Sequence, residues 1–265
     1  LRRGNVVGAL QVGVRPRPGG LDTTGVLQAA AAGRIECLLL LGADPLADFP
    51  DADLARRAIA GARRVIAVDT FLSASSLQAD VVLAASAVGE KGGTTTNLEG
   101  RVTSLGRRVT ATGTSRPDWM IASGIAGLLG TEFGYRSIAD VTASIAARVE
   151  SYANVTATAV ASAPDGVLAA VPADLGPLVP PVLSLPDRNS YDFRLVVSRR
   201  LYDDAVSTRT SPSLAHLAGC MTVHVNPLDI ERAGAHDGAE VRLSSARAGI
   251  IVRAASKAGV AEEAG

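Results

Sequence analysis

Glutamate and lysine stand side by side at Glu90 and Lys91, directly before the glycine pair Gly92-Gly93. A few positions earlier, residues 81–83 form an aliphatic run typical of a strand buried on both faces of a parallel sheet. Open α/β sheets bind their ligands beyond the carboxyl ends of such strands. The pattern therefore predicts that charge and glycine are delivered to the ligand-binding edge of a sheet.

A second turn, Gly42-Ala43-Asp44-Pro45, follows the apolar run that ends at Leu41. Its backbone amides could face an anion where a helix begins. Glycine and Asp-Pro also terminate strands without binding anything, and both interpretations stay open. The chain contains no Gly-x-Gly pair, so the dinucleotide fingerprint of nicotinamide enzymes is absent. Asp69, at the end of another predicted strand, is then expected to be a turn or capping acid.

The stretch from Ala79 to Arg101 reads ADVVLAASAVGEKGGTTTNLEGR and closely resembles the ADVVLP…EK-GT-TN-EGR signature of the molybdopterin oxidoreductase superfamily. Within that superfamily it looks most like the large iron–sulfur (G) subunit of the bacterial, and more narrowly actinobacterial, NADH-quinone oxidoreductase (respiratory complex I). Ala84 departs from the pattern, because the family usually has proline there. Downstream, residues 223–255 resemble the barrel domain that binds molybdopterin dinucleotide in the same superfamily.

The resemblance implies a pterin pocket built from three segments of the chain. Its candidate residues are Gly42 and Asp44, then Glu90, Gly93, Thr94 and Asn97, and finally Asn226 and Asp229. Resemblance to the large iron–sulfur subunit of complex I implies that this pocket is vestigial, with no catalytic residue, metal ion or cofactor in the chain. The alternative is a working molybdopterin-dependent oxidoreductase of the formate dehydrogenase or nitrate reductase type, with molybdopterin dinucleotide bound there. A second rival, a standalone nucleotide-binding module, is disfavoured by the missing Gly-x-Gly pair.

The loop that carries Glu90 and Lys91 also has a purely structural interpretation. Adjacent residues of an extended segment point in opposite directions, so these two are not expected to act as one acid–base pair. We expect one of them to anchor the loop at the edge of the sheet. The chain must also reverse direction here, and we expect Gly92 or Gly93 to adopt a positive φ.

Two cysteines, Cys37 and Cys220, are too few for an iron–sulfur cluster, which four cysteines typically hold. Clusters are therefore expected in an N-terminal part of the iron–sulfur subunit that precedes this piece of polypeptide. Cys37 lies within an apolar run and is expected to be a core thiol. His216, Cys220 and His224 recur at intervals of four, but Gly219 breaks a helix and the next residues alternate like a strand. No metal site is expected there.

Composition excludes several classes of partner. The 265 residues carry 26 basic and 26 acidic side chains and only 3% aromatics, so neither a nucleic-acid footprint nor a stacking platform is present. No apolar run approaches the length of a membrane span. The resemblance implies instead that the partners are other subunits of the peripheral arm of complex I, including the NADH/FMN-binding subunit. It places the chain at the cytoplasmic face of the bacterial inner membrane.

Periodicity and breakers divide the chain into three parts. Residues 1–150 are predicted to form an α/β domain with a doubly wound, mostly parallel sheet; its strands lie at 35–41, 65–68 and 81–83. Its helices are expected at 23–32, 52–60, 117–130 and 137–149, the third with a broad buried face. Residues 151–189 are rich in alanine and proline and are predicted to be a linker. Residues 190–265 are predicted to form a β-barrel, double-psi by resemblance and incomplete, with strands at 193–198, 222–226, 240–245 and 249–254.

Overall fold

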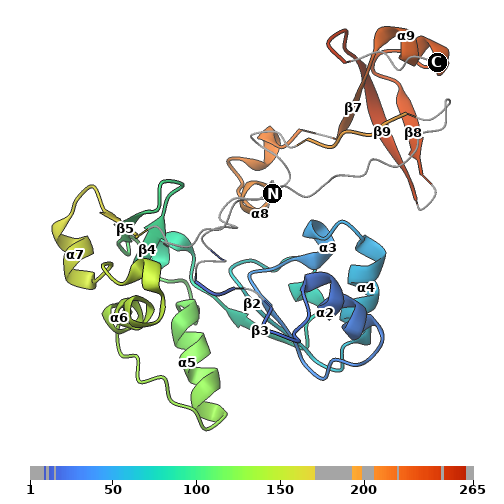
Figure 1. The fold of residues 1–265 in the computed structure, drawn as a ribbon. Coiled ribbons are helices and arrows are strands. Elements are labelled where there is room, and N and C mark those ends of the chain that lie inside the picture. Colours follow the sequence, from blue (N-terminus) through green and yellow to red (C-terminus); the bar gives the residue numbers. More distant parts are fainter. Residues whose placement is uncertain are drawn as a thin grey trace. The chain divides into compact units, whose positions relative to one another are not determined.

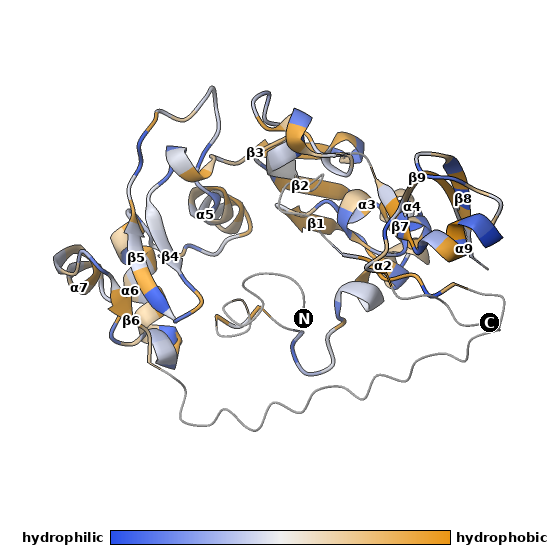
Figure 2. Cartoon of the chain, turned by 90° about the horizontal axis from the view of Figure 1, so that it is seen from above, coloured by the Kyte–Doolittle hydropathy of each residue, from blue (hydrophilic) through white to orange (hydrophobic). Residues whose placement is uncertain are grey.

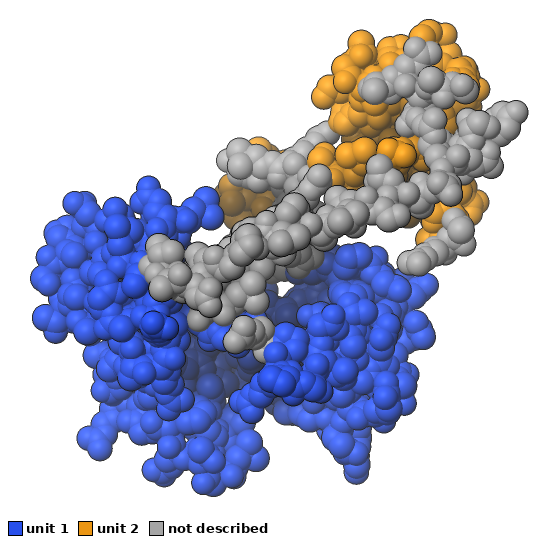
Figure 3. Space-filling view, viewed as in Figure 1, with its two compact units in different colours: residues 1–178 blue, residues 179–265 orange. Residues whose placement is uncertain are grey.

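The computed structural model describes residues 9, 12–14, 16–170, 193–198, 206–219, 221–245 and 248–260. The chain divides into two compact units, Leu1–Leu178 and Val179–Gly265, which are drawn in blue and orange in Figure 3. Each unit is considered by itself below. None of the helices in the described ranges is both long and apolar enough to cross a membrane.

Unit 1 contains a parallel sheet of three strands in the order β1-β2-β3 (Figure 1). The strands are β1 (Leu38–Leu41), β2 (Val65–Asp69) and β3 (Val81–Ala84). The connections hold α2 (Thr23–Ala31) before β1, then α3 (Pro45–Asp48) and α4 (Ala52–Gly61), and then the 3₁₀ turn η1 (Ser76–Gln78). These elements confirm the predicted succession of strands and helices, including the N-caps supplied by Asp22 and Asp51.

The core of this part lies between the sheet and the helices α2 and α4. Leu38 and Leu40 of β1, together with Val65 and Ala67 of β2, pack against Ile59 of α4. A second cluster, made of Leu27, Ala30, Leu54 and Ala58, fills the space between the two helices. Gly61 lets them approach closely, because a Cβ added there would lie 2.4 Å from the carbonyl oxygen of Ala30. The prediction of a doubly wound sheet is confirmed only as a parallel α/β sheet, with α2 and α4 both on one face.

The rest of unit 1 surrounds an antiparallel sheet in the order β4-β5-β6. Its strands are β4 (Gly93–Thr96), β5 (Arg101–Leu105) and β6 (Val167–Leu168), and the 3₁₀ turns η2 (Val88–Glu90) and η3 (Glu150–Tyr152) flank them. Three helices accompany it: α5 (Asp118–Leu128), α6 (Ile138–Arg148) and α7 (Ala157–Ser162). The predicted capping box of α6 is present, with Ser137 and Asp140 bonded to each other's backbone amides. The broad buried face predicted for α5 is wrong, because only Ala126 is buried and Leu128 is 91% exposed.

Residues 150–169 are not the linker that their composition suggested. Val102 of β5 is fully buried beneath Tyr152, Val155 and Val160, so the segment supplies the core of the antiparallel sheet. Thr156 caps α7, and β6 then pairs with β5. The linker prediction failed here because small and β-branched residues at these positions bury side chains against a strand far away in the sequence. The remaining predicted linker, residues 171–189, lies outside the described residues.

A short bridge joins the two sheets of unit 1. Beyond β3, Ala85 pairs with Arg116 in parallel. The Ser86 amide donates to the Arg116 carbonyl oxygen at 2.9 Å, and the Arg116 amide donates to the Ala84 carbonyl oxygen at 3.1 Å. Helix α5 begins at once after this bridge. The chain therefore departs from the parallel sheet at Ala85 and returns to the same place at Arg116.

Unit 2 contains a mixed sheet in the order β7-β9-β8. Strand β7 (Thr222–Val225) runs parallel to β9 (Gly249–Ser256), and β8 (Glu240–Ser244) runs antiparallel to it. These strands confirm three of the four predicted ones, whereas residues 193–198 are described without strand structure. The short helices α8 (Val206–Arg209) and α9 (Pro227–Arg232) and the 3₁₀ turn η4 (Ala215–Leu217) complete the unit. A closed barrel remains a prediction, because the described residues show this open sheet.

Candidate functional site

The turn after β1 is fixed by a buried acid. Gly42 has a φ of +56°, a conformation that glycine adopts without steric cost, and its amide donates to the Val68 carbonyl oxygen at 2.8 Å. Asp44 is 4% exposed. Its Oδ1 accepts hydrogen bonds from the amide and hydroxyl of Ser75, at 3.1 and 2.5 Å. The Ala74 amide donates to Oδ2 at 3.3 Å. Asp44 therefore ties the carboxyl end of β1 to the loop that follows β2.

That loop is itself organised by serines. The Ser73 hydroxyl donates to Asp69 Oδ2 at 2.9 Å, and the Ser76 amide donates to the Ser73 oxygen at 3.2 Å. The Ser75 hydroxyl also accepts from the Leu46 amide at 3.1 Å, which orients the start of α3. All three serines are buried. Asp69 is thus a turn acid, as predicted, and the serines are site residues that sequence reasoning missed.

Glu90 and Lys91 each anchor a different segment, in agreement with the structural interpretation. Glu90 Oε2 accepts from the Ala87 amide at 2.9 Å, and Oε1 accepts from the amide and hydroxyl of Thr112, at 3.3 and 3.1 Å. The Ala87 hydrogen bond, supported by those from Thr112, lowers the pKa of Glu90 below its ordinary value. Lys91 forms an ion pair with Asp118 in the first turn of α5. The two side chains therefore hold the loop and do not form an acid–base pair.

The glycine prediction is wrong at this loop. Neither Gly92 nor Gly93 is among the glycines with positive φ, and Gly93 begins β4 opposite Leu105. Thr94 pairs with Ser104 in the same ladder. The chain reverses later, in the turn between β4 and β5, where Gly100 has a φ of +79°. The physical reason is that β4 enters its sheet fully extended, so the tight turn falls at the end of the hairpin.

Asn97 shapes that hairpin turn. Its side-chain oxygen accepts from the amides of Glu99 and Arg101, both at 2.9 Å. The Gly100 amide donates to the Asn97 carbonyl oxygen at 3.0 Å. Such a side-chain-to-backbone turn is a common structural role for asparagine. The Asn97 oxygen is therefore committed to the turn.

The last two candidates belong to unit 2, whereas the others belong to unit 1. Asn226 caps α9 by accepting from the Leu228 amide at 3.0 Å, and its Nδ2 donates to the Val260 carbonyl oxygen at 2.8 Å. Asp229 is 2% exposed, and Arg232 donates to its Oδ1 at 3.3 Å. Both side chains stabilise the local structure of unit 2.

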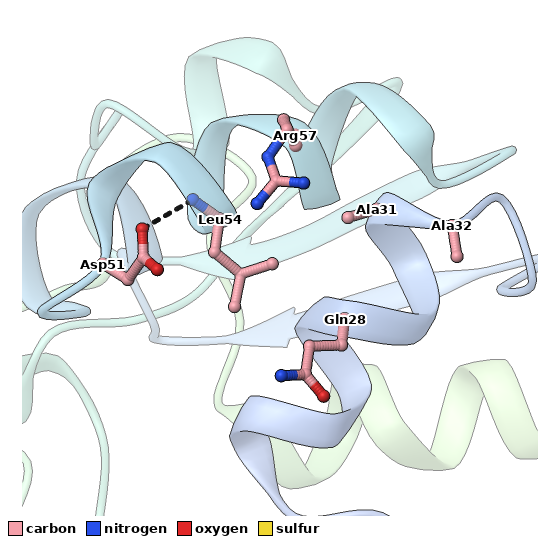
Figure 4. Close-up of a pocket in the computed structure, with 6 residues that line it drawn as sticks. All are labelled: Gln28, Ala31, Ala32, Asp51, Leu54 and Arg57. Carbon is pink, nitrogen blue, oxygen red and sulfur yellow. Dashed lines mark hydrogen bonds between the residues drawn. The ribbon is translucent and has the colours of Figure 1, made fainter. Parts of the chain in front are cut away.

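Cys37 and the surface pocket do not coincide with the predicted site. Cys37 is exposed, which contradicts its prediction as a core thiol, because it lies at the entry to β1 rather than under the helices. A shallow pocket of about 380 Å³ lies between α2 and α4 (Figure 4). It is lined by Gln28, Ala31, Ala32, Asp51, Leu54 and Arg57. One oxygen of Asp51 is already used to cap α4 through the Leu54 amide, at 3.0 Å.

Comparison with known proteins identifies the family context. Residues 1–128 match the molybdopterin oxidoreductase family. The chain is 30% identical over 230 residues to the NADPH-Fe(3+) oxidoreductase subunit alpha of Geobacter sulfurreducens, covering 87% of this chain and 26% of that protein. It is 40% identical over 90 residues to a G-type subunit, numbered 2, of the NADH-quinone oxidoreductase of Rhizobium meliloti, covering 34% of this chain and 11% of that protein. Formate dehydrogenases and an assimilatory nitrate reductase match as well.

A solved structure with a similar fold is the acetylene hydratase from Pelobacter acetylenicus. It shares 12% sequence identity at a TM-score of 0.69, over 88% of this chain and 37% of that chain. This likeness shows the fold alone. The chain spans about a quarter of the length of its Geobacter relative.

Proposed function

Because residues 1–128 belong to the molybdopterin oxidoreductase family, we propose that this chain is a cofactor-free structural part of a large electron-transfer subunit. We propose the large iron–sulfur (G) subunit of an ion-translocating NADH-quinone oxidoreductase, a complex that passes electrons from NADH to a quinone. The 40% identity to one such subunit over 90 residues supports this choice. In this role the chain contains no redox centre, and iron–sulfur clusters lie elsewhere in the same polypeptide.

One observation carries the proposal. The polar side chains that a pterin pocket would use are already bonded to the chain itself: Asp44 to the 73–76 loop, Glu90 to Ala87 and Thr112, and Asn97 to its own turn. In unit 2 the same holds for Asn226 and Asp229. Recruiting any of them for a ligand would leave buried donors without acceptors, which is costly. This arrangement does not fit molybdopterin dinucleotide, and no chemical step is derived through that group.

We propose that the partners of the chain are other subunits of the peripheral arm, including the subunit that binds NADH and FMN. Its location would then be the cytoplasmic face of the bacterial inner membrane. Affinity purification of the tagged gene product under mild detergent conditions tests this. Recovery of the peripheral-arm subunits in constant ratio is the expected result. Purification without them would contradict the assignment to complex I.

A second candidate is a catalytic molybdopterin-dependent oxidoreductase of the formate dehydrogenase or nitrate reductase type. The matches to such enzymes favour it. Elemental analysis of the complete, correctly folded gene product separates the two. We expect molybdenum far below one atom per chain, even in cells that load a control molybdoenzyme fully. Stoichiometric molybdenum would overturn the structural role and establish the catalytic one.

A further inference from the structure

The two faces of the parallel sheet in unit 1 are unequally covered. Leu38 and Leu40 are buried under α2 and α4, as are Val65 and Ala67. The register places alternate residues on the opposite face, because Leu39 pairs with Ile66 and Ile66 pairs with Val81. We call that side the bare face; its residues are Leu39, Leu41, Ile66, Val68, Val81 and Leu83.

Every side chain of the bare face is aliphatic, yet much of it is exposed. Leu39 is 45%, Leu41 67% and Val81 46% exposed. Ile66 and Leu83 are half-buried, and only Val68 is fully covered. Figure 2 shows the strands of this sheet in the orange of hydrophobic residues. Such a surface offers no group that would bind a charged ligand or a nucleic acid, and it marks a site of protein contact.

We propose that an α-helix with an aliphatic side, from a part of the same polypeptide outside these 265 residues, covers the bare face. Parallel sheets occur almost only with both faces covered, and the usual cover is helices. The helices that cover this sheet within the described residues, α2 and α4, lie on the other face. The Geobacter relative has the required material, since only 26% of its length aligns with this chain. The row Leu39, Ile66 and Val81 crosses all three strands and provides the seat for the helix.

Cys37 is a natural reporter of this contact. The Arg64 amide donates to the Glu36 carbonyl oxygen at 3.0 Å, and the Leu38 amide donates to the Arg64 carbonyl oxygen at 2.8 Å. These bonds extend the parallel ladder by one residue and place Cys37 on the same side as Leu39. Its thiol is exposed in the 265-residue chain. A helix seated on the bare face would lie over or beside that thiol.

The experiment compares the rate of Cys37 alkylation by iodoacetamide in the 265-residue chain and in the complete gene product, with peptide mass spectrometry to separate Cys37 from Cys220. We expect alkylation to be slower by about tenfold or more in the complete product. Leu39→Asp should restore fast alkylation there without destabilising the isolated chain, where Leu39 is already exposed. Leu98→Asp, at a fully exposed hairpin position, is the matched control and should leave the protection of Cys37 unchanged.

Several outcomes would overturn the proposal. Equal alkylation rates in the two proteins would show that nothing covers the bare face, and so would a gene product no longer than this chain. Protection that grows with concentration and accompanies a dimer in light scattering would assign the face to a second copy. Protection in the monomeric 265-residue chain would assign it to a segment of this chain. Protection only in the complete product, abolished by Leu39→Asp, supports the proposal.

Discussion

The two sheets of unit 1 are stabilised in different ways. The parallel sheet is built from consecutive strands and helices, and its core residues come from neighbouring segments such as Leu40, Ile59 and Val65. The antiparallel sheet begins as a hairpin, but its central Val102 is buried only when Tyr152, Val155 and Val160 arrive from much later in the chain. The first sheet therefore depends on close helix packing and the second on one distant segment. Substitutions in the two regions should differ accordingly.

Gly61→Val should have the largest effect on the parallel sheet. A Cβ at this position would lie 2.4 Å from the Ala30 carbonyl oxygen, so α2 and α4 must separate. We expect the free energy of unfolding to fall by about 3 kcal/mol in urea denaturation. Hydrogen exchange should lose more protection in residues 23–86 than in residues 88–170. Gly124→Val, in open space on α5, is the control; equal losses for both variants would refute the close-packing account.

Asp44→Ala should weaken the edge of the same sheet by a different mechanism. It leaves the amides of Ala74 and Ser75 without their acceptor in a buried setting. We expect a loss of about 2 kcal/mol in the free energy of unfolding, measured by urea denaturation. Glu36→Ala removes an exposed surface ion pair with Arg63 and should cost less than about 0.5 kcal/mol. Similar losses for the two variants would mean that the Asp44 network does not stabilise the edge.

Tyr152→Phe tests how the distant segment is attached to the antiparallel sheet. The Tyr152 hydroxyl lies 2.9 Å from Thr96 Oγ1 of β4, and the ring packs over Val102. Removing only the hydroxyl should cost about 1 kcal/mol, with α7 and β6 losing hydrogen-exchange protection first. Thr96→Val should cost a similar amount, and the double variant should show that the two losses are not additive. Fully additive losses would contradict a direct hydrogen bond.

Glu90→Gln should have the smallest effect, visible only in the dependence of stability on pH. The hydrogen bond from Ala87, supported by those from Thr112, lowers the pKa of Glu90 in the folded chain. A lowered pKa contributes stability that is fully present above the ordinary glutamate pKa of about 4.3 and is lost as the pH falls through the folded value. The difference in unfolding free energy between wild type and variant should therefore be constant near neutrality and shrink in acid. A difference that grows in acid would refute the sign.

The parallel sheet could be predicted from the sequence because its signals are local. Aliphatic runs mark the strands, and Asp22 and Asp51 mark the helix starts. The antiparallel sheet could not, because residues 150–169 show the composition of a linker and gain their structure only against Val102. The bare face also escaped prediction: an aliphatic run indicates a buried strand but not which residues bury it.

The candidate site was predicted by residue but not by role. Asp44, Glu90 and Asn97 all lie at turns, as their positions after strands and before glycines indicated. Their partners could not be predicted, since Ser75 lies 31 residues from Asp44 and Thr112 lies 22 residues from Glu90. The only available signal was the serine cluster at residues 73–76, whose small hydroxyl side chains suit a buried loop. The positive φ was assigned to the wrong glycine because the extent of β4 could not be predicted.

The bridge between Ala85 and Arg116 has a consequence for how this chain can change in evolution. Because the intervening residues leave and re-enter the structure at one point, their length is decoupled from the positions of β3 and α5. Insertions into such an excursion add little closure entropy. Short glycine–serine insertions next to Leu98, which is fully exposed at the hairpin turn, should be tolerated in a scanning library. Insertions of the same length at residues 84–86 would shift the bridge itself and should abolish folding, so descendants of this chain can vary the hairpin while the closure point stays fixed.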